Sequence, residues 1–302
     1  MSIAPDPERS AIVFGGGGLA GIAWELGLLQ GLLDEGIPLD DADLVVGTSA
    51  GSMVGAILRF GMVSQAFDQQ LAPPPSSYVE PPALPADEYE ARYRAALGAP
   101  PMTEQVARAR IGDAASRVTH GPSDDERVAT FAQTLPDAWP DAPLLVTAVD
   151  AEDGTFRTFS SGDDIRLPRA VAASCCVPFV WSPVRVHDRT YIDGGVRSVT
   201  NADVAAGCGR VLVIACRDEV PSPTGPALDA AVAAMRANGS RVEVVVADAG
   251  SQAAFGDNSL ALSSQAPSAH AGRIQAGVVA ERVRSFWLDA DEPRLTRTQP
   301  AP

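Results

Sequence analysis

Short apolar runs alternate with helical repeats at the start of the chain. Residues 11–14 form an apolar run that predicts a buried strand, and four glycines follow it. Apolar residues then recur at helical spacing between residues 19 and 33, and Gly36 with Pro38 predicts the end of that helix. A second apolar run at 44–46 leads through a glycine-rich turn into another helical pattern. Strand, helix, strand, helix predicts a parallel sheet.

The second half of the chain repeats these patterns. Further strand patterns occupy residues 144–149, 155–159, 180–186, 190–192, 211–215 and 242–247. The first two are joined by Glu152-Asp153-Gly154, which predicts a hairpin. A helical pattern at 269–287 closes the chain. We expect one α/β domain over residues 10–290, with flexible tails at 1–9 and 291–302.

Residues 65–140 differ from the rest in composition. Six prolines lie between Pro73 and Pro85, and charge-rich helical stretches follow at 89–97 and 103–118. The pattern predicts a helical and proline-rich insertion over the sheet. Two interpretations stay open, namely a solvated surface excursion and a lid or wall for an acyl chain.

Composition and charge exclude several classes of function. The 302 residues carry 23 basic and 38 acidic side chains, a net charge of −15, which would repel nucleic acid and anionic surfaces at long range. We therefore expect no nucleic-acid partner. Every basic residue is arginine, so a P-loop lysine, a Schiff-base lysine and a serine–lysine dyad are all excluded.

The cysteines and the first residues bear on compartment and metals. Cys175, Cys176, Cys208 and Cys216 show no C-x-x-C spacing, so we predict no metal site. The first residues have no secretory pattern, and no apolar run approaches the roughly 20 residues that span a bilayer. A cytoplasmic protein with reduced cysteines, in peripheral contact with membranes at most, is the expectation.

A glycine loop follows the first strand. Residues 16–21 satisfy G-x-G-x-x-G, so backbone N–H groups at a helix start can converge on an anionic oxygen. One alternative is a dinucleotide-binding protein that uses Gly16, Gly18 and Gly21. Such a site needs an acidic residue at the end of the second strand, where this chain has Thr48-Ser49 instead. The loop by itself predicts only an anion site.

A serine lies in a similar turn after the second strand. Residues 47–51 have the form G-x-S-x-G, which predicts a strained strand-to-helix elbow with Ser49 as nucleophile. A plain helix start capped by Ser49 or Ser52 is the structural alternative. An α/β-hydrolase normally places several strands before this elbow, and here one strand precedes it.

The serine needs a base. Asp193 stands at a predicted strand end before Gly194-Gly195, and burial would give its carboxylate the pKa of a general base. A plain turn is the alternative for this tripeptide. A catalytic triad with His270 is a second possibility, whereas His187 lies in a polar turn.

The glycine loop, the G-x-S-x-G elbow and the D-G-G tripeptide, in this order, resemble the bacterial members of the patatin-like phospholipase family. The resemblance implies a three-layer α/β/α sandwich and a Ser–Asp dyad of Ser49 and Asp193. It also implies an oxyanion hole at Gly16, Gly17 and Gly18, without cofactor or metal. Many members carry Arg or Lys where this chain has Ala20, which weakens the case for an anionic phospholipid headgroup.

The expected function is that of a lipid acyl hydrolase of the phospholipase A, lysophospholipase or carboxylesterase type. It would act through an acyl-serine intermediate on a lipid or other acyl-ester substrate. The alternatives are the dinucleotide-binding protein and a catalytically silent patatin-like protein. Because so acidic a protein needs an apolar entrance for a lipid, residues 73–130 are expected to border the acyl-binding cavity.

Overall fold

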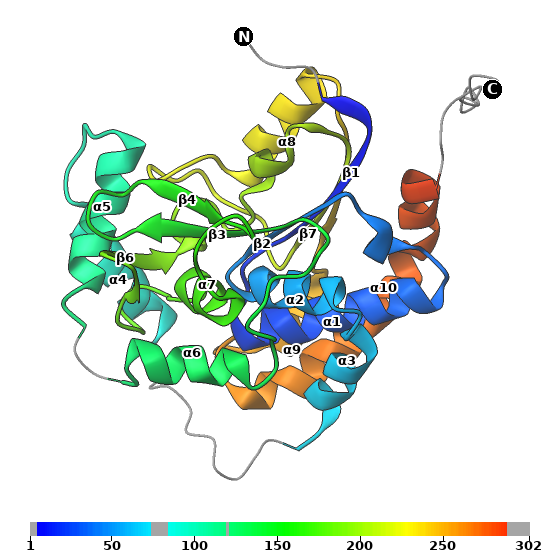
Figure 1. Ribbon diagram of the computed structural model, residues 1–302, viewed down its shortest axis with the longest axis horizontal. Helices are drawn as coiled ribbons and strands as arrows, with labels where there is room; N and C mark the ends of the chain where they lie inside the picture. The colour runs from blue at the N-terminus through cyan, green and yellow to red at the C-terminus, as the bar shows by residue number, and fades with distance from the viewer. Residues whose placement is uncertain (1–4, 74–83, 119–120, 289–302) are drawn as a thin grey trace.

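The computed structural model describes residues 5–73, 84–118 and 121–288 (Figure 1). Its strands are β1 (Asp6–Phe14), β2 (Leu44–Thr48), β3 (Leu144–Asp150), β4 (Phe156–Phe159), β5 (Val184–Val186), β6 (Arg189–Asp193), β7 (Cys208–Ala215) and β8 (Arg241–Val246). Its α-helices are α1 (Gly18–Asp34), α2 (Ala50–Arg59), α3 (Val63–Leu71), α4 (Ala86–Leu97), α5 (Glu104–Ala115), α6 (Asp124–Ala132), α7 (Leu167–Ser174), α8 (Leu228–Ala237), α9 (Ala249–Phe255) and α10 (Gln265–Leu288).

The strands of the described ranges form one mixed sheet. Their order is β5-β6-β3-β2-β1-β7-β8, and β4 also pairs with β3. The five strands from β3 to β8 along this order pair in parallel, whereas β4 and β6 run antiparallel to β3, and β5 antiparallel to β6. The prediction of a parallel sheet therefore holds for its centre, and the hairpin of β3 and β4 is confirmed.

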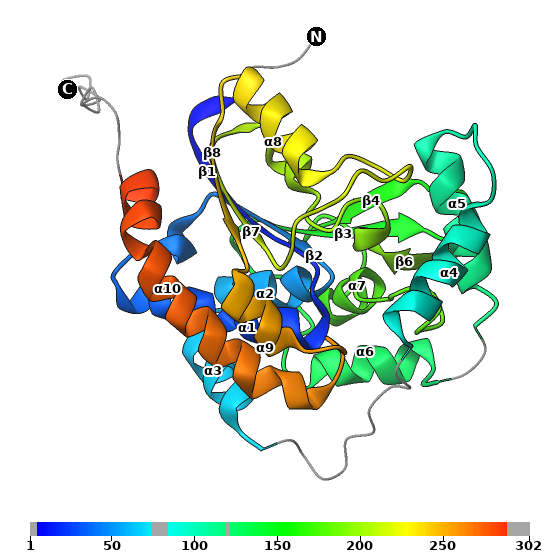
Figure 2. The ribbon, with the colours of Figure 1, turned by 180° about the vertical axis from the view of Figure 1, so that it is seen from behind.

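Alternate residues of β1 face two different helical layers. Ile12 and Phe14 belong to the core shared with α1, α2 and α10, while Ala11 and Val13 belong to the core shared with α8. Strict alternation of this kind is what a strand buried on both faces requires. Figures 1 and 2 show α8 on the opposite side of the sheet from α1 and α10. The three-layer α/β/α sandwich is confirmed.

The insertion packs over the end of the sheet that carries β3 and β6. It supplies α4, α5 and α6 between α3 and β3. Ile111 and Ala115 of α5 share an apolar cluster with Val149 of β3 and Ile192 of β6. Helix α6 packs against α7. Helices α5 and α6 of the insertion therefore pack against the core, α5 on β3 and β6 and α6 on α7.

Two boundaries predicted from the sequence are wrong. The strand expected at 180–186 is reduced to β5, because residues 177–181 form a turn in which the Trp181 N–H donates to the Val177 carbonyl. The tail expected at 1–9 is wrong for residues 6–9, which belong to β1, where Asp6 pairs with Cys208. Residues 291–302 lie outside the described residues. Within the described ranges, none of the helices is long and apolar enough to cross a membrane.

Candidate active site

Ser49 occupies a strained elbow between β2 and α2. Its φ of 54° lies in the left-handed region, and its side chain is 7% exposed. A Cβ atom at Gly47 would lie 2.5 Å from the Gly51 carbonyl oxygen, and one at Gly51 would lie 2.2 Å from that of Phe14. Both flanking glycines are therefore required by close backbone packing. The Ser49 N–H donates to Ser174 Oγ at 2.9 Å, which holds the elbow against α7.

Strand β3 aligns Asp193 with the elbow. Thr48 of β2 pairs with Thr147, and Asp193 at the end of β6 pairs with the next residue, Ala148. Thr147 and Ala148 are adjacent on β3. Ser49, which directly follows Thr48, therefore lies at the same end of the strands as Asp193. A Cβ atom at Gly194 would lie 2.2 Å from Thr147 Oγ1, so this position must be glycine for β6 to end there.

The carboxylate of Asp193 is in an environment that favours its neutral form. Burial raises its pKa to about 6, from an ordinary value of 3.8. Hydrogen bonding with the Ser49 side chain and with the Gly195 N–H, which donates to Oδ1 at 2.7 Å, opposes this rise. A carboxylate with a pKa near 6 that contacts a serine hydroxyl is suited to accept its proton at neutral pH.

The glycine loop contacts the elbow from the other side. The Gly51 N–H donates to the Gly15 carbonyl at 2.9 Å, and a Cβ atom at Gly16 would lie 3.2 Å from the Cβ of Ser49. The Gly16 N–H already donates to the Val199 carbonyl at 2.8 Å, so it is not available to an oxyanion. This arrangement contradicts Gly16 as an oxyanion donor. Within the described chain, the N–H groups of Gly17 and Gly18 have no acceptor.

The histidines stand apart from this arrangement. His187 is exposed in the turn between β5 and β6, and His270 is exposed on α10. Neither is among the groups that perturb the pKa of Asp193. His120 lies outside the described residues. The structure therefore places the carboxylate of Asp193 next to Ser49, whereas His270 lies apart from both residues.

Comparison with known proteins identifies the family. The sequence profile of the patatin-like phospholipases matches residues 12–206, which include the glycine loop, the elbow and Asp193. The chain belongs to the patatin-like phospholipase family. No curated protein gives a significant match to the chain.

Solved structures of bacterial proteins show a more distant similarity. ExoU from the type III secretion system of Pseudomonas aeruginosa, solved in complex with SpcU, is 16% identical with a TM-score of 0.41, over 95% of this chain and 54% of that chain. VipD from Legionella pneumophila is 14% identical with a TM-score of 0.36, over 72% of this chain and 51% of that chain. The chain thus spans about half the length of each.

A buried polar network lies beside Ser49 and Asp193. The side-chain amide of Asn201, which is fully buried, donates to the carbonyls of Gly194 and Ser198 at 3.1 and 2.8 Å and to Thr48 Oγ1 at 3.1 Å. Thr48 Oγ1 also lies 2.8 Å from Thr147 Oγ1. These bonds tie the end of β2 to the turn after Asp193. Asn201 was not predicted from the sequence, although it follows the D-G-G tripeptide by only six residues.

The insertion contributes two side chains near Asp193 that were not predicted from the sequence either. Tyr89 of α4 and Asp193 interact electrostatically, which raises the pKa of the tyrosine further above the value that burial alone gives. Tyr89 packs edge-to-face on Phe179, with 5.8 Å between ring centroids. Arg127 of α6 lowers the pKa of Asp193. No local motif marks either residue.

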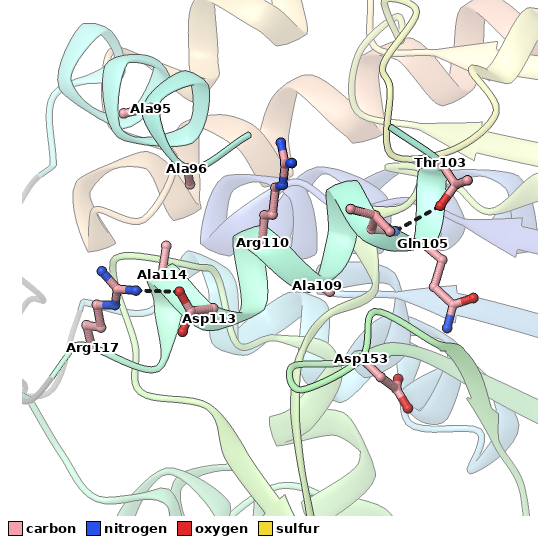
Figure 3. A pocket seen from close by; sticks show the side chains of 11 residues that line it. Ala95, Ala96, Thr103, Gln105, Ala109, Arg110, Asp113, Ala114, Arg117 and Asp153 are labelled. Carbon is pink, nitrogen blue, oxygen red and sulfur yellow. Dashed lines mark hydrogen bonds and ion pairs between the residues drawn. The ribbon is translucent and has the colours of Figure 1, made fainter. Parts of the chain in front are cut away.

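A cavity of about 600 Å³ lies between α4 and α5, away from Ser49 and Asp193 (Figure 3). Its lining includes Arg110, Asp113 and Arg117 but neither Ser49 nor Asp193. Its charged groups are already paired, because Arg117 bonds Asp113 and Arg110 donates to the Leu97 carbonyl. This cavity therefore lies apart from Ser49 and Asp193.

Proposed function

We propose that the protein hydrolyses carboxylic esters of lipids through a covalent acyl intermediate on Ser49, with Asp193 as general base. The observation that carries the proposal is the meeting of a strained serine with a buried carboxylate whose pKa is about 6. Membership of the patatin-like phospholipase family supports the same chemistry. The dinucleotide alternative has no acidic residue at the end of β2, where the elbow stands.

The first half of the reaction forms the acyl-enzyme. Asp193 accepts the proton of Ser49 Oγ as that oxygen attacks the ester carbonyl. The negative charge that develops on the carbonyl oxygen is stabilised by the N–H groups of Gly17 and Gly18. Collapse of this intermediate breaks the bond to the alcohol, which leaves with the proton from Asp193.

The second half releases the fatty acid. Asp193 accepts a proton from a water molecule as its oxygen attacks the acyl carbonyl, and the same N–H groups stabilise the second tetrahedral intermediate. Ser49 Oγ then leaves and recovers its proton from Asp193. One carboxylate therefore serves as base and acid in turn, and the cycle uses protein groups and water only.

Labelling with a fluorophosphonate tests the nucleophile. Ser49→Ala should abolish both labelling and ester hydrolysis while its circular dichroism spectrum stays that of the native protein, because little packing is lost. Ser64→Ala, on the exposed side of the neighbouring helix α3, is the matched control and should react as the native chain does. Mapping the modified peptide to Ser52, or labelling that persists in Ser49→Ala, would contradict the assignment. A folded native protein that neither reacts nor hydrolyses esters would favour the catalytically silent alternative.

A further inference from the structure

Arg127 is a buried cation, and one nitrogen of its guanidinium group has no hydrogen-bond acceptor in the described part of the chain. It lies on α6 within the insertion, and the residue is 6% exposed. Its Nη2 donates to the Cys175 carbonyl at 2.9 Å, and its guanidinium carbon lies 4.7 Å from the centre of the Trp181 ring. Among the described residues Nη1 has no acceptor within hydrogen-bond distance, and the guanidinium also interacts with the Cys176 thiol, a weak acceptor. A buried guanidinium nitrogen without a partner is costly, which points to an acceptor that arrives with a ligand.

This guanidinium is held next to the nucleophile elbow. Cys175, whose carbonyl it bonds, directly follows Ser174, and Ser174 Oγ accepts the Ser49 N–H. The Cys175 thiol in turn lies 3.7 Å from Ser52 Oγ, on the first turn of α2. The positive charge also lowers the pKa of Asp193. Arg127 is therefore fixed to the same segment that positions Ser49.

Arg217 is a second cation beside the dyad. It is exposed directly after β7 and, within the described ranges, has no ion-pair partner. Its charge acts on Asp193 and on Tyr89. The preceding Cys216 packs on the glycine loop, since a Cβ atom at Gly17 would lie 2.5 Å from its sulfur. One cation thus lies inside the site and the other at its surface.

We propose that Arg127, assisted by Arg217, binds a phosphate group of the substrate close to the scissile ester and so determines specificity. This inference rests on the proposed function and deepens it. The glycine loop carries Ala20, which has no charge, so a cation must come from another element if the site is to bind an anion. A guanidinium offers directed N–H donors that match phosphate oxygens. In a chain of net charge −15, two such cations also give an anionic ester a local attraction.

Two substrates that differ only in the phosphate test this role. Dihexanoyl phosphatidic acid and dihexanoylglycerol carry the same acyl chains, and both are assayed below their critical micelle concentrations. The measured quantity is the ratio of kcat/KM for the first to kcat/KM for the second. At pH 8 the carboxyl of Asp193, with its pKa of about 6, stays ionised, so the influence of Arg127 on that group does not enter.

The expected result is a loss of preference for the phosphate. Arg127→Gln should lower the ratio by about 10-fold to 100-fold, as for the loss of a charged hydrogen bond. Arg217→Gln should lower it about threefold, because exposed charges are screened. Arg282→Gln is the control, since it removes the same charge from the exposed face of α10, where Arg282 pairs with Glu243, and should leave the ratio unchanged. A folded Arg127→Gln protein with the native ratio would overturn the proposal.

Equilibrium binding to the Ser49→Ala variant separates this proposal from the hydrolytic one. Calorimetry should show dihexanoyl phosphatidic acid bound at least 10-fold more tightly than dihexanoylglycerol, and Arg127→Gln should remove most of that difference. The result is independent of any turnover, so an inactive protein leaves the binding test intact. Inorganic phosphate bound as tightly as the lipid would overturn assignment to a lipid headgroup. If Arg127→Gln does not fold, Arg217→Gln in the same background carries the test, and an unchanged lipid affinity there refutes the pair.

Discussion

The ionisation of Asp193 gives the proposed mechanism a specific dependence on pH. With a pKa of about 6, roughly one carboxyl in eleven is ionised at pH 5 and about ten in eleven at pH 7. Because only the ionised form accepts a proton from Ser49, kcat/KM should rise about tenfold between these two values and then level off. An enzyme whose aspartate had the ordinary pKa of 3.8 would lose less than about a tenth of its activity at pH 5.

A histidine base would imitate this profile, since an unperturbed imidazole has a pKa of about 6.5. The chain offers a clean control because it contains three histidines, His120, His187 and His270. A triple His→Gln variant should keep kcat/KM within about threefold of the native value and the same inflection near pH 6. Asp193→Asn, which cannot accept the proton, should lose about 10²-fold to 10⁴-fold in kcat.

The assay is the release of hexanoate from a neutral hexanoyl ester, measured by chromatography so that no coloured product titrates in the same range. Each variant is compared with the native protein in circular dichroism at both ends of the pH range. A histidine-free protein that is folded but inactive would refute the dyad. So would a native profile that stays flat from pH 5 to pH 8, because the carboxyl would then not be the group that titrates.

Two further predictions concern stability. A raised folded-state pKa gives Asp193 a stabilising contribution that is complete below its unfolded pKa of 3.8 and is lost as pH rises through about 6. Asp193→Asn should therefore increase the free energy of unfolding in urea by about 3 kcal/mol at pH 8, at about 1.4 kcal/mol per pH unit, and by nothing at pH 3. Gly51→Ala should lower it by at least about 1–3 kcal/mol, because the new methyl group meets the Phe14 carbonyl. Gly277→Ala, exposed on α10 with open space around it, should instead gain about 0.5–1 kcal/mol, and equal effects of the two alanines would contradict the packing argument.

The parts of the fold that follow from local pattern were predictable from the sequence. Buried strands such as β2 and β7 are short apolar runs, and the glycines after β1 clearly mark the end of that strand. The mixed character of the sheet was harder to see. β5 and β6 are joined by two residues, which is too short for a parallel crossover, but the apolar stretch around Phe179 concealed where β5 begins. Phe179 has a positive φ of 67°, a strain that only the folded context can impose.

The residues of the candidate site also differ in whether the sequence could predict them. Ser49 and Asp193 lie in short motifs in which close backbone packing requires glycine at neighbouring positions. These motifs are therefore visible in the sequence itself. Asn201 bonds Thr48 across 153 residues of sequence, and Arg127 bonds Cys175 across 48. Such contacts leave no periodic pattern, because they are made by tertiary packing between elements whose order in space was unknown. For this reason Asn201 with its hydrogen bonds, and the position of Arg127 beside the elbow, could be found only in the folded chain.

The distribution of these residues separates the proposed chemistry from the proposed selectivity. Ser49 and Asp193, the proposed nucleophile and base, are aligned by adjacent positions of β3, and a slip of one residue in that register would turn the side chains of a strand to the opposite face. Arg127, by contrast, belongs to an insertion helix that packs on α7 and adds nothing to the pairing of the strands. Under the proposal, a side-chain change on the substrate-facing part of α6 can alter which ester is preferred and leave the strand pairing that aligns Ser49 and Asp193 unchanged. On this proposal an uncharged Ala20 is compatible with an anionic substrate, because the positive charge comes from Arg127 on the insertion and not from the glycine loop.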